Sequence, residues 1–196
     1  MAPRFNIATL LTWFRIAAIP LFAVVFYLPP SEWMRPMACV IFTIAGLTDW
    51  LDGYLARRLN LMSKFGAFLD PVADKLMVTL TLVIIVQADP EWFIALTAAI
   101  IIGREFNISA LREWMAEIGA RNIVAVTGIG KLKTILQMVG LGMMIWKYPF
   151  YGLPIYEMGM ALLIISAGLT MYSMFVYIRA AWPALRDPDG PGINDS

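Results

Sequence analysis

Four aspartates are the residues of this chain best placed to do chemistry. Asp49 and Asp52 are three residues apart, and Asp70 and Asp74 are four residues apart. On a helix, each spacing puts both carboxylates on one face, with Cβ atoms about 5–6 Å apart. Four like charges need compensation, which two divalent cations bound through oxygen, Mg²⁺ or Mn²⁺, would supply. The spacing therefore predicts a two-metal site of the kind that stabilises the entering and leaving oxygens of phosphoryl transfer.

Two small residues share the helical face of the first aspartate pair. Gly53 lies four residues after Asp49, and Ala56 lies four residues after Asp52. They leave room beside the metals for a bulky diphosphate. The structural alternative is that the aspartates cap helices or pair with nearby cations, with Asp70-Pro71 as a helix start. One helix start does not require four aspartates on two facing surfaces, so we favour the metal site.

Composition excludes several other kinds of chemistry. The chain has no histidine and one cysteine, Cys39, which excludes Ser-His-Asp triads, His-ligated metals and cysteine-cluster zinc sites. The net charge of +1 gives no electrostatic support for nucleic-acid binding. Of the 196 residues, 60% are apolar and 15% are charged, against about 25% charged in soluble domains. The chain is therefore expected to be an integral membrane protein.

The elements that must position the aspartates are membrane-spanning helices, each of which needs roughly 20 mostly apolar residues. The sequence predicts an all-α fold with six transmembrane helices in residues 1–182, followed by a polar tail at 183–196. The second and third helices are joined by a short link, which makes them antiparallel neighbours with the four aspartates near one end of their seam. The six predicted spans are Ile7–Leu28, Met37–Arg58, Phe65–Val86, Trp92–Glu117, Leu132–Trp146 and Leu153–Ile178.

The distribution of basic residues predicts the orientation of these spans. Six spans put both termini on one side, and that side collects every lysine and arginine except Arg35 and Lys147. Positive charge marks the cytoplasmic side, so both termini and the aspartates are expected there. A cation transporter or channel is the rival reading of the aspartates. It requires charges near the bilayer midplane and a second charged half, and the sequence has neither.

The segment from Asp49 to Asp74 resembles the signature of the CDP-alcohol phosphatidyltransferase family, D-x2-D-G-x2-A-R-x8-G-x3-D-x3-D. The resemblance extends to residues 5–15, 104–105, 109–117 and 130–134. Ala8 stands where proline is expected, and Gly103 where alanine is expected, but neither change removes a chemical group. All eight fixed positions of the signature are filled, by Asp49, Asp52, Gly53, Ala56, Arg57, Gly66, Asp70 and Asp74.

The resemblance implies an enzyme that moves the phosphatidyl group of CDP-diacylglycerol to sn-glycerol 3-phosphate and releases CMP. It implies two Mg²⁺ or Mn²⁺ ions on Asp49, Asp52, Asp70 and Asp74, with Asp74 also the candidate general base. The donor would contact Asn6, Thr9, Asp49, Gly53, Ala56, Arg57 and Gly66. The acceptor phosphate needs cations, and the candidates on the cytoplasmic half are Arg104, Arg112, Lys131 and Lys133.

Several alternatives stay open. Metal ligation and base catalysis compete at Asp74, because a carboxylate beside two dications is a weak base. The basic residues also serve as topology-setting charge. Inositol phosphate, serine or a second lipid would support the same chemistry as acceptors. A homodimer in the bacterial cytoplasmic (inner) membrane, with its active site facing the cytoplasm, rests on family analogy and the charge pattern.

Overall fold

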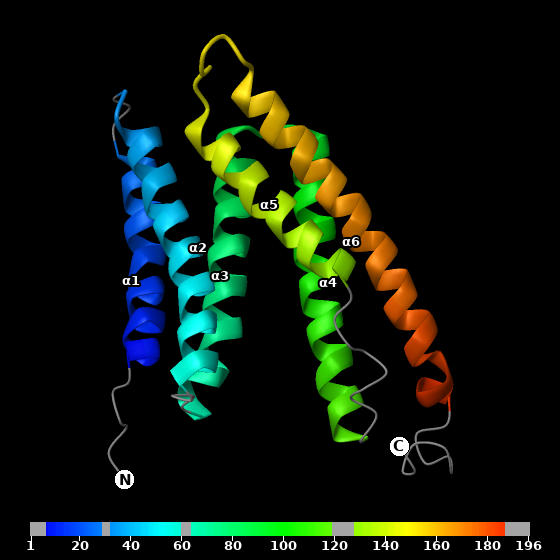
Figure 1. Cartoon of the computed structure of the whole chain (residues 1–196). Coiled ribbons are helices and arrows are strands. Elements are labelled where there is room, and N and C mark those ends of the chain that lie inside the picture. Colours follow the sequence, from blue (N-terminus) through cyan, green and yellow to red (C-terminus); the bar gives the residue numbers. More distant parts are fainter. Residues whose placement is uncertain (1–6, 29–31, 60–63, 119–127, 187–196) are drawn as a thin grey trace. The chain divides into compact units, whose positions relative to one another are not determined.

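The computed structural model describes residues 7–28, 32–59, 64–118 and 128–186, and within them the chain is helical. An isolated bridge between Phe150 and Leu153 is the one extended pairing in those residues. This confirms the predicted all-α class. The helices are α1 Ile7–Tyr27, α2 Met34–Leu59, α3 Lys64–Ala88, α4 Trp92–Glu117, α5 Gly128–Trp146 and α6 Ile155–Arg186 (Figure 1).

The helix ends differ from the predicted spans where polar residues continue a helix beyond its apolar stretch. The bounds of α4 are as predicted, whereas α5 begins four residues before Leu132 and α6 runs eight residues beyond Ile178. Hydropathy marks the part of a helix that suits lipid, but backbone hydrogen bonding continues into the flanking polar residues. Pro71 lies inside α3, so Asp70-Pro71 does not mark a helix start.

Within the described side chains, three helices contain stretches long and apolar enough to cross a membrane: Pro71–Ala88, Trp92–Glu117 and Ile155–Trp182. The described parts of the other three helices carry shorter apolar stretches: Trp13–Tyr27, Met34–Thr48 and Leu132–Trp146. Large apolar side chains point outward on many turns, as at Val24 and Phe175, which are 59% and 65% exposed. An apolar exterior over helices of this length is that of a multi-pass membrane protein.

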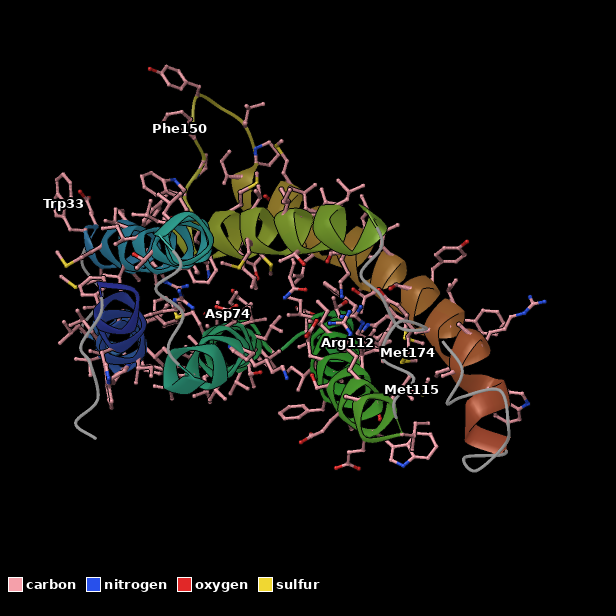
Figure 2. The ribbon with its side chains drawn as sticks, turned by 60° about the horizontal axis from the view of Figure 1, so that its bottom comes forward. Trp33, Asp74, Arg112, Met115, Phe150 and Met174 are labelled. Atoms are coloured by element: carbon pink, nitrogen blue, oxygen red, sulfur yellow. The ribbon has the colours of Figure 1, made fainter. Side chains whose placement is uncertain are left out.

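Contacts divide the chain into two compact units, and the first comprises residues 1–90 and 140–160. In this unit α1 packs against both α2 and α3 (Figure 1). Phe22 is fully buried, with its ring near those of Phe26 and Phe42. Trp33 and Phe150 stand away from the helices, one before α2 and one between α5 and α6 (Figure 2).

The second unit comprises residues 91–139 and 161–196. Here α4 and α6 meet in a cluster of buried side chains, Ile108 and Met115 from α4 with Tyr177 and Ala181 from α6. Met174 packs against its edge (Figure 2). Arg104 lies four residues before Ile108, so the same face of α4 that forms this cluster also carries a buried guanidinium.

Candidate active site

The first unit places the four aspartate positions at matched depths on two antiparallel helices (Figure 1). Asp52 lies seven residues before the end of α2, and Asp70 lies six residues after the start of α3. Asp49 and Asp74 each lie ten residues from the same two ends. At 1.5 Å per residue, both pairs therefore stand about 10–15 Å along the helices from the connection at 60–63. The backbone thus brings the two pairs to the same level of the unit.

The side chain of Asp74 is held by an arginine from another helix. Arg15 Nη1 of α1 donates a hydrogen bond of 2.8 Å to Asp74 Oδ1. The arginine is 1% exposed, whereas the carboxylate side chain is 46% exposed. A guanidinium so deeply buried requires a counter-charge. The ion pair therefore ties α1 to α3 and fixes one oxygen of a carboxylate that stays accessible.

The donor set at these positions suits a divalent cation. Four carboxylates supply only oxygen, the ligand that Mg²⁺ and Mn²⁺ prefer, and no thiolate or imidazole competes. The side chains of Asp49, Asp52 and Asp70 lie outside the described residues. Among the side chains that are described, no three metal-ligating groups come together. The fit to metal thus rests on donor chemistry and helix position.

Several of the residues predicted to bind the donor also have side chains outside the described residues. Asn6 lies outside the described residues, as do the side chains of Thr9, Ala56 and Arg57. Their backbone positions follow from the helices: Thr9 lies in the first turn of α1, and Gly53 continues α2 one residue after Asp52. Gly66 lies in the first turn of α3.

The second unit buries two of the predicted acceptor-binding cations side by side. Arg104 of α4 and Lys133 of α5 are 6% and 5% exposed. Both contact the same oxygen of one carboxylate: Arg104 Nη1 lies 2.7 Å from Glu105 Oε1, and Lys133 Nζ lies 3.5 Å from it. The structure therefore joins Arg104 and Lys133 into one buried, charged cluster, with Glu105 as their shared partner.

A polar face of α6 completes the surroundings of this cluster. Ser166, Thr170 and Ser173 are all buried, at spacings of four and three residues that place them on one face. Arg104 Nη2 lies 3.5 Å from Ser173 Oγ, and Ser166 donates a 2.9 Å hydrogen bond to the backbone oxygen of Lys133. The interior of this unit therefore contains a polar region around Arg104 and Lys133, beside the apolar cluster of Ile108 and Met115.

Arg112 and Lys131, the other two predicted acceptor ligands, are placed differently. Arg112 is exposed, and its guanidinium lies over the ring of Tyr177 at 5.7 Å from the centroid. It nevertheless acts electrostatically on Lys133, together with Arg104. Lys131 lies near the start of α5, and its side chain is outside the described residues.

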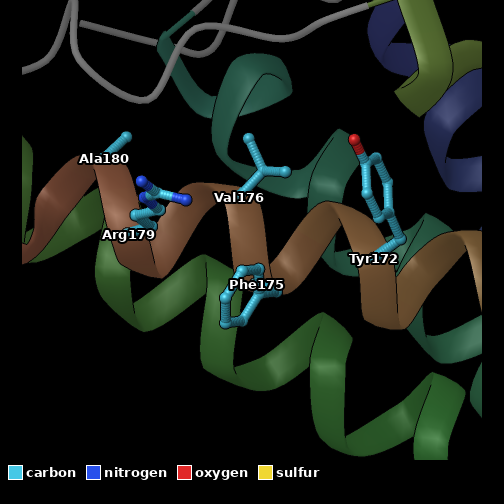
Figure 3. Close-up of a pocket in the computed structure, with 5 residues that line it drawn as sticks. All are labelled: Tyr172, Phe175, Val176, Arg179 and Ala180. Atoms are coloured by element: carbon cyan, nitrogen blue, oxygen red, sulfur yellow. The ribbon is translucent and has the colours of Figure 1, made fainter.

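A second set of α6 residues lines a groove of about 680 Å³ (Figure 3). Its lining is exposed and mostly apolar, with Arg179 as the one charge among Tyr172, Phe175, Val176 and Ala180. None of the predicted site residues lines it. The groove is therefore separate from the polar cluster around Arg104 and Lys133.

Comparison with known proteins identifies the family of this chain. A family model described as CDP-alcohol phosphatidyltransferase matches residues 5–175. The chain belongs to this family. The phosphatidyltransferase is 50% identical over 184 residues to a protein of Salmonella typhimurium (strain LT2), and 49% identical over 184 residues to one of Escherichia coli (strain K12). Each match covers 94% of this chain and 99% of the relative, and both relatives are named CDP-diacylglycerol–glycerol-3-phosphate 3-phosphatidyltransferase.

Three residues of the phosphatidyltransferase that sequence reasoning did not assign to the site lie in these clusters. Arg15 had a sequence signal, because it is the sole charge inside the first apolar stretch. Glu105 directly follows Arg104 in the sequence. That position gives no sign that its carboxylate also contacts a residue of another helix. Ser173 belongs to the Ser166, Thr170, Ser173 stripe, whose helical spacing is visible in the sequence.

Proposed function

We propose that this phosphatidyltransferase transfers the phosphatidyl group of CDP-diacylglycerol to sn-glycerol 3-phosphate, forming phosphatidylglycerophosphate and CMP. The observation that carries the proposal is 49–50% identity, over 94% of the chain, to relatives named for that reaction. The family match at residues 5–175 includes all eight positions of the aspartate signature.

The four aspartates, Asp49, Asp52, Asp70 and Asp74, would hold two divalent cations, Mg²⁺ or Mn²⁺. When bound, such ions neutralise the charge of a diphosphate and polarise its phosphorus. The matched depths of the two pairs on α2 and α3 support this assignment. Gly53 and Ala56 give the donor a face without bulky side chains, and Asn6, Thr9, Arg57 and Gly66 are its remaining proposed contacts.

Asp74 is also the proposed general base. It takes the proton of the acceptor hydroxyl as the oxygen bonds to the β-phosphorus of the donor, and the bond from that phosphorus to the CMP oxygen breaks. A base must be held in place to act on one hydroxyl. The 2.8 Å contact with buried Arg15 supports the assignment, because it fixes Asp74 Oδ1 while the side chain stays accessible.

Arg104, Arg112, Lys131 and Lys133 would bind the phosphate of the acceptor. Arginine offers paired donors to a phosphate and lysine a point charge. The burial of Arg104 and Lys133 among hydroxyl groups supports this, because charge that served topology alone would reach toward water or headgroups. Glycerol 3-phosphate would thereby be distinguished from glycerol.

We also propose that residues 1–182 cross a bacterial inner membrane six times, with both termini and the active site cytoplasmic. The positions of the lysines and arginines support this orientation. The polar tail would begin near residue 183. A homodimer is proposed from family analogy alone.

The reaction is tested with purified protein in detergent, given CDP-diacylglycerol, Mg²⁺ and one acceptor at a time. Glycerol 3-phosphate, inositol phosphate and serine are compared by CMP release and by mass spectrometry of the lipid product. We expect glycerol 3-phosphate to be used at least tenfold faster than either alternative. Faster transfer to inositol phosphate or serine would keep the chemistry and replace the proposed acceptor.

A further inference from the structure

Glu105 is placed where the acceptor phosphate is expected to bind. Its Oε1 lies 2.7 Å from Arg104 Nη1 and 3.5 Å from Lys133 Nζ, and the cations come from two different helices. Both cations are more than nine-tenths buried, whereas the Glu105 side chain is 32% exposed. A carboxylate thus occupies the position between two cations that a phosphate would also seek.

The charges around Glu105 are unbalanced. Arg104, Lys133 and, at longer range, Arg112 bring three positive charges, and Glu105 brings one negative charge. The buried residues Gln137, Ser166, Thr170 and Ser173 are neutral. Buried cations are stabilised by nearby anions, and here the described residues supply fewer anions than cations. The cluster therefore has electrostatic capacity for a second anion.

Arg104 also has hydrogen-bond donors with which it could bind a second anion. Its buried Nε has no hydrogen-bond partner among the described residues, and its Nη2 has only the 3.5 Å contact with Ser173 Oγ. A buried guanidinium N–H without a partner is costly, and an anion with several acceptor oxygens relieves that cost. The tetrahedral oxygens of a phosphate monoester match this need.

We propose that Glu105 is the resident counter-ion of the acceptor pocket, and that the acceptor phosphate takes its place as partner of Arg104 and Lys133. This rests on the proposed function, in which those two cations bind glycerol 3-phosphate. Without acceptor, Glu105 compensates the buried charges and holds α4 to α5. With acceptor bound, its charge repels the phosphate and weakens binding. Glu105 is then an affinity-setting and positioning residue, not a catalytic one.

The test removes the charge of Glu105 and keeps its shape. In Glu105→Gln the amide oxygen still accepts a hydrogen bond from Arg104, so the main loss is the negative charge. Purified variants are titrated with glycerol 3-phosphate and inorganic phosphate, without donor, and the apparent Kd is read from the rise in unfolding temperature. Glu113→Gln is the matched control, because Glu113 is an exposed residue of the same helix.

We expect Glu105→Gln to bind glycerol 3-phosphate and inorganic phosphate roughly 5- to 30-fold more tightly than the wild type, as removal of one nearby like charge predicts. Glu113→Gln should leave the Kd within twofold. An equal or weaker affinity in Glu105→Gln would overturn the inference. If that variant does not fold, Glu105→Ala is compared with Glu105→Asp. The proposal requires tighter binding by the alanine variant, which lacks the charge, and equal or weaker binding by it overturns the proposal.

Arg104→Gln separates this inference from the proposed function. We expect it to weaken glycerol 3-phosphate binding at least tenfold. If it does so while Glu105→Gln fails to tighten binding, the acceptor site stands and the role given to Glu105 is wrong. If neither Arg104→Gln nor Lys133→Gln changes the Kd, the acceptor site itself is wrong.

Discussion

Arg15 holds the carboxylate of Asp74 by a direct ion pair between two helices. It is buried in α1 and reaches the carboxylate at 2.8 Å. A hydrogen bond between charged groups contributes about 1.5–3 kcal/mol. If the same loss appears in the transition state, Arg15→Gln lowers kcat roughly 10- to 150-fold. The KM values of both substrates should change by less than about threefold, because substrate contacts are not removed.

The control for Arg15→Gln is Arg179→Gln, which removes an exposed arginine from the groove lined by residues of α6. The control should retain wild-type kcat. Steady-state kinetics with both substrates varied separates the effects. A wild-type kcat in Arg15→Gln, in protein with a normal unfolding temperature, would show that the ion pair does not position the base.

Helix α6 contains a glycine, Gly159, at a close contact with α5, and a substitution there can test how closely the two helices pack. A Cβ built on Gly159 would lie 2.7 Å from Met143 Cβ and 2.8 Å from the Gly140 backbone oxygen, both on α5. Neither is the far end of a flexible side chain, so the helices must move apart. We expect Gly159→Ala to reduce the free energy of unfolding by about 1–3 kcal/mol.

Gly168 is the matched control, because it lies in the same helix and a Cβ there meets nothing within 4 Å. Gly168→Ala should leave the unfolding temperature unchanged or raise it slightly, since alanine favours helix over glycine by up to about 1 kcal/mol. Thermal unfolding in one detergent compares the two variants. Equal stability of both would contradict the close approach of α5 and α6 at Gly159.

The sequence predicts the elements better than it predicts their contacts. All six helices could be located from apolar stretches, because lipid imposes a simple requirement on length and polarity. Helix ends such as Arg186 could not, because hydropathy does not report where backbone hydrogen bonding stops. The aspartate pairs were visible because helical spacing relates residues three and four apart.

Contacts between residues of different helices could not be predicted from the spacing of residues within one helix. Arg15 and Asp74 are 59 positions apart, and Glu105 and Lys133 are 28 apart. No periodicity within one helix reveals which residue of another helix faces it. Arg104 and Lys133 were predicted together from their charge, their place on the cytoplasmic half and the family resemblance, whereas the carboxylate that joins them is revealed only by the contact between α4 and α5.

The proposed membrane topology of the whole molecule can be tested by chemical labelling of introduced cysteines. Tyr151, between α5 and α6, is 93% exposed, and Arg186 ends α6. In a Cys39→Ser background, Tyr151→Cys should react with a membrane-impermeant maleimide in intact cells, because the proposed orientation puts that connection outside. Arg186→Cys should react only after the membrane is opened. The reverse pattern would invert the proposed orientation, and labelling of both in intact cells would require an even number of crossings between them, so that α6 would not span the membrane.

The central claim is that this protein makes phosphatidylglycerophosphate by divalent-metal chemistry at the four aspartates. The most direct measurement follows product and CMP together, with purified protein, CDP-diacylglycerol and glycerol 3-phosphate, in Mg²⁺, in excess EDTA, and after Mg²⁺ is restored. We expect equal amounts of lipid product and CMP with Mg²⁺, none in EDTA, and recovery on restoration. In Asp49→Asn, activity should fall by several orders of magnitude, because stabilisation of transition-state charge by metal contributes several kcal/mol. Undiminished product formation in EDTA, or CMP release without phosphatidylglycerophosphate, would contradict the account.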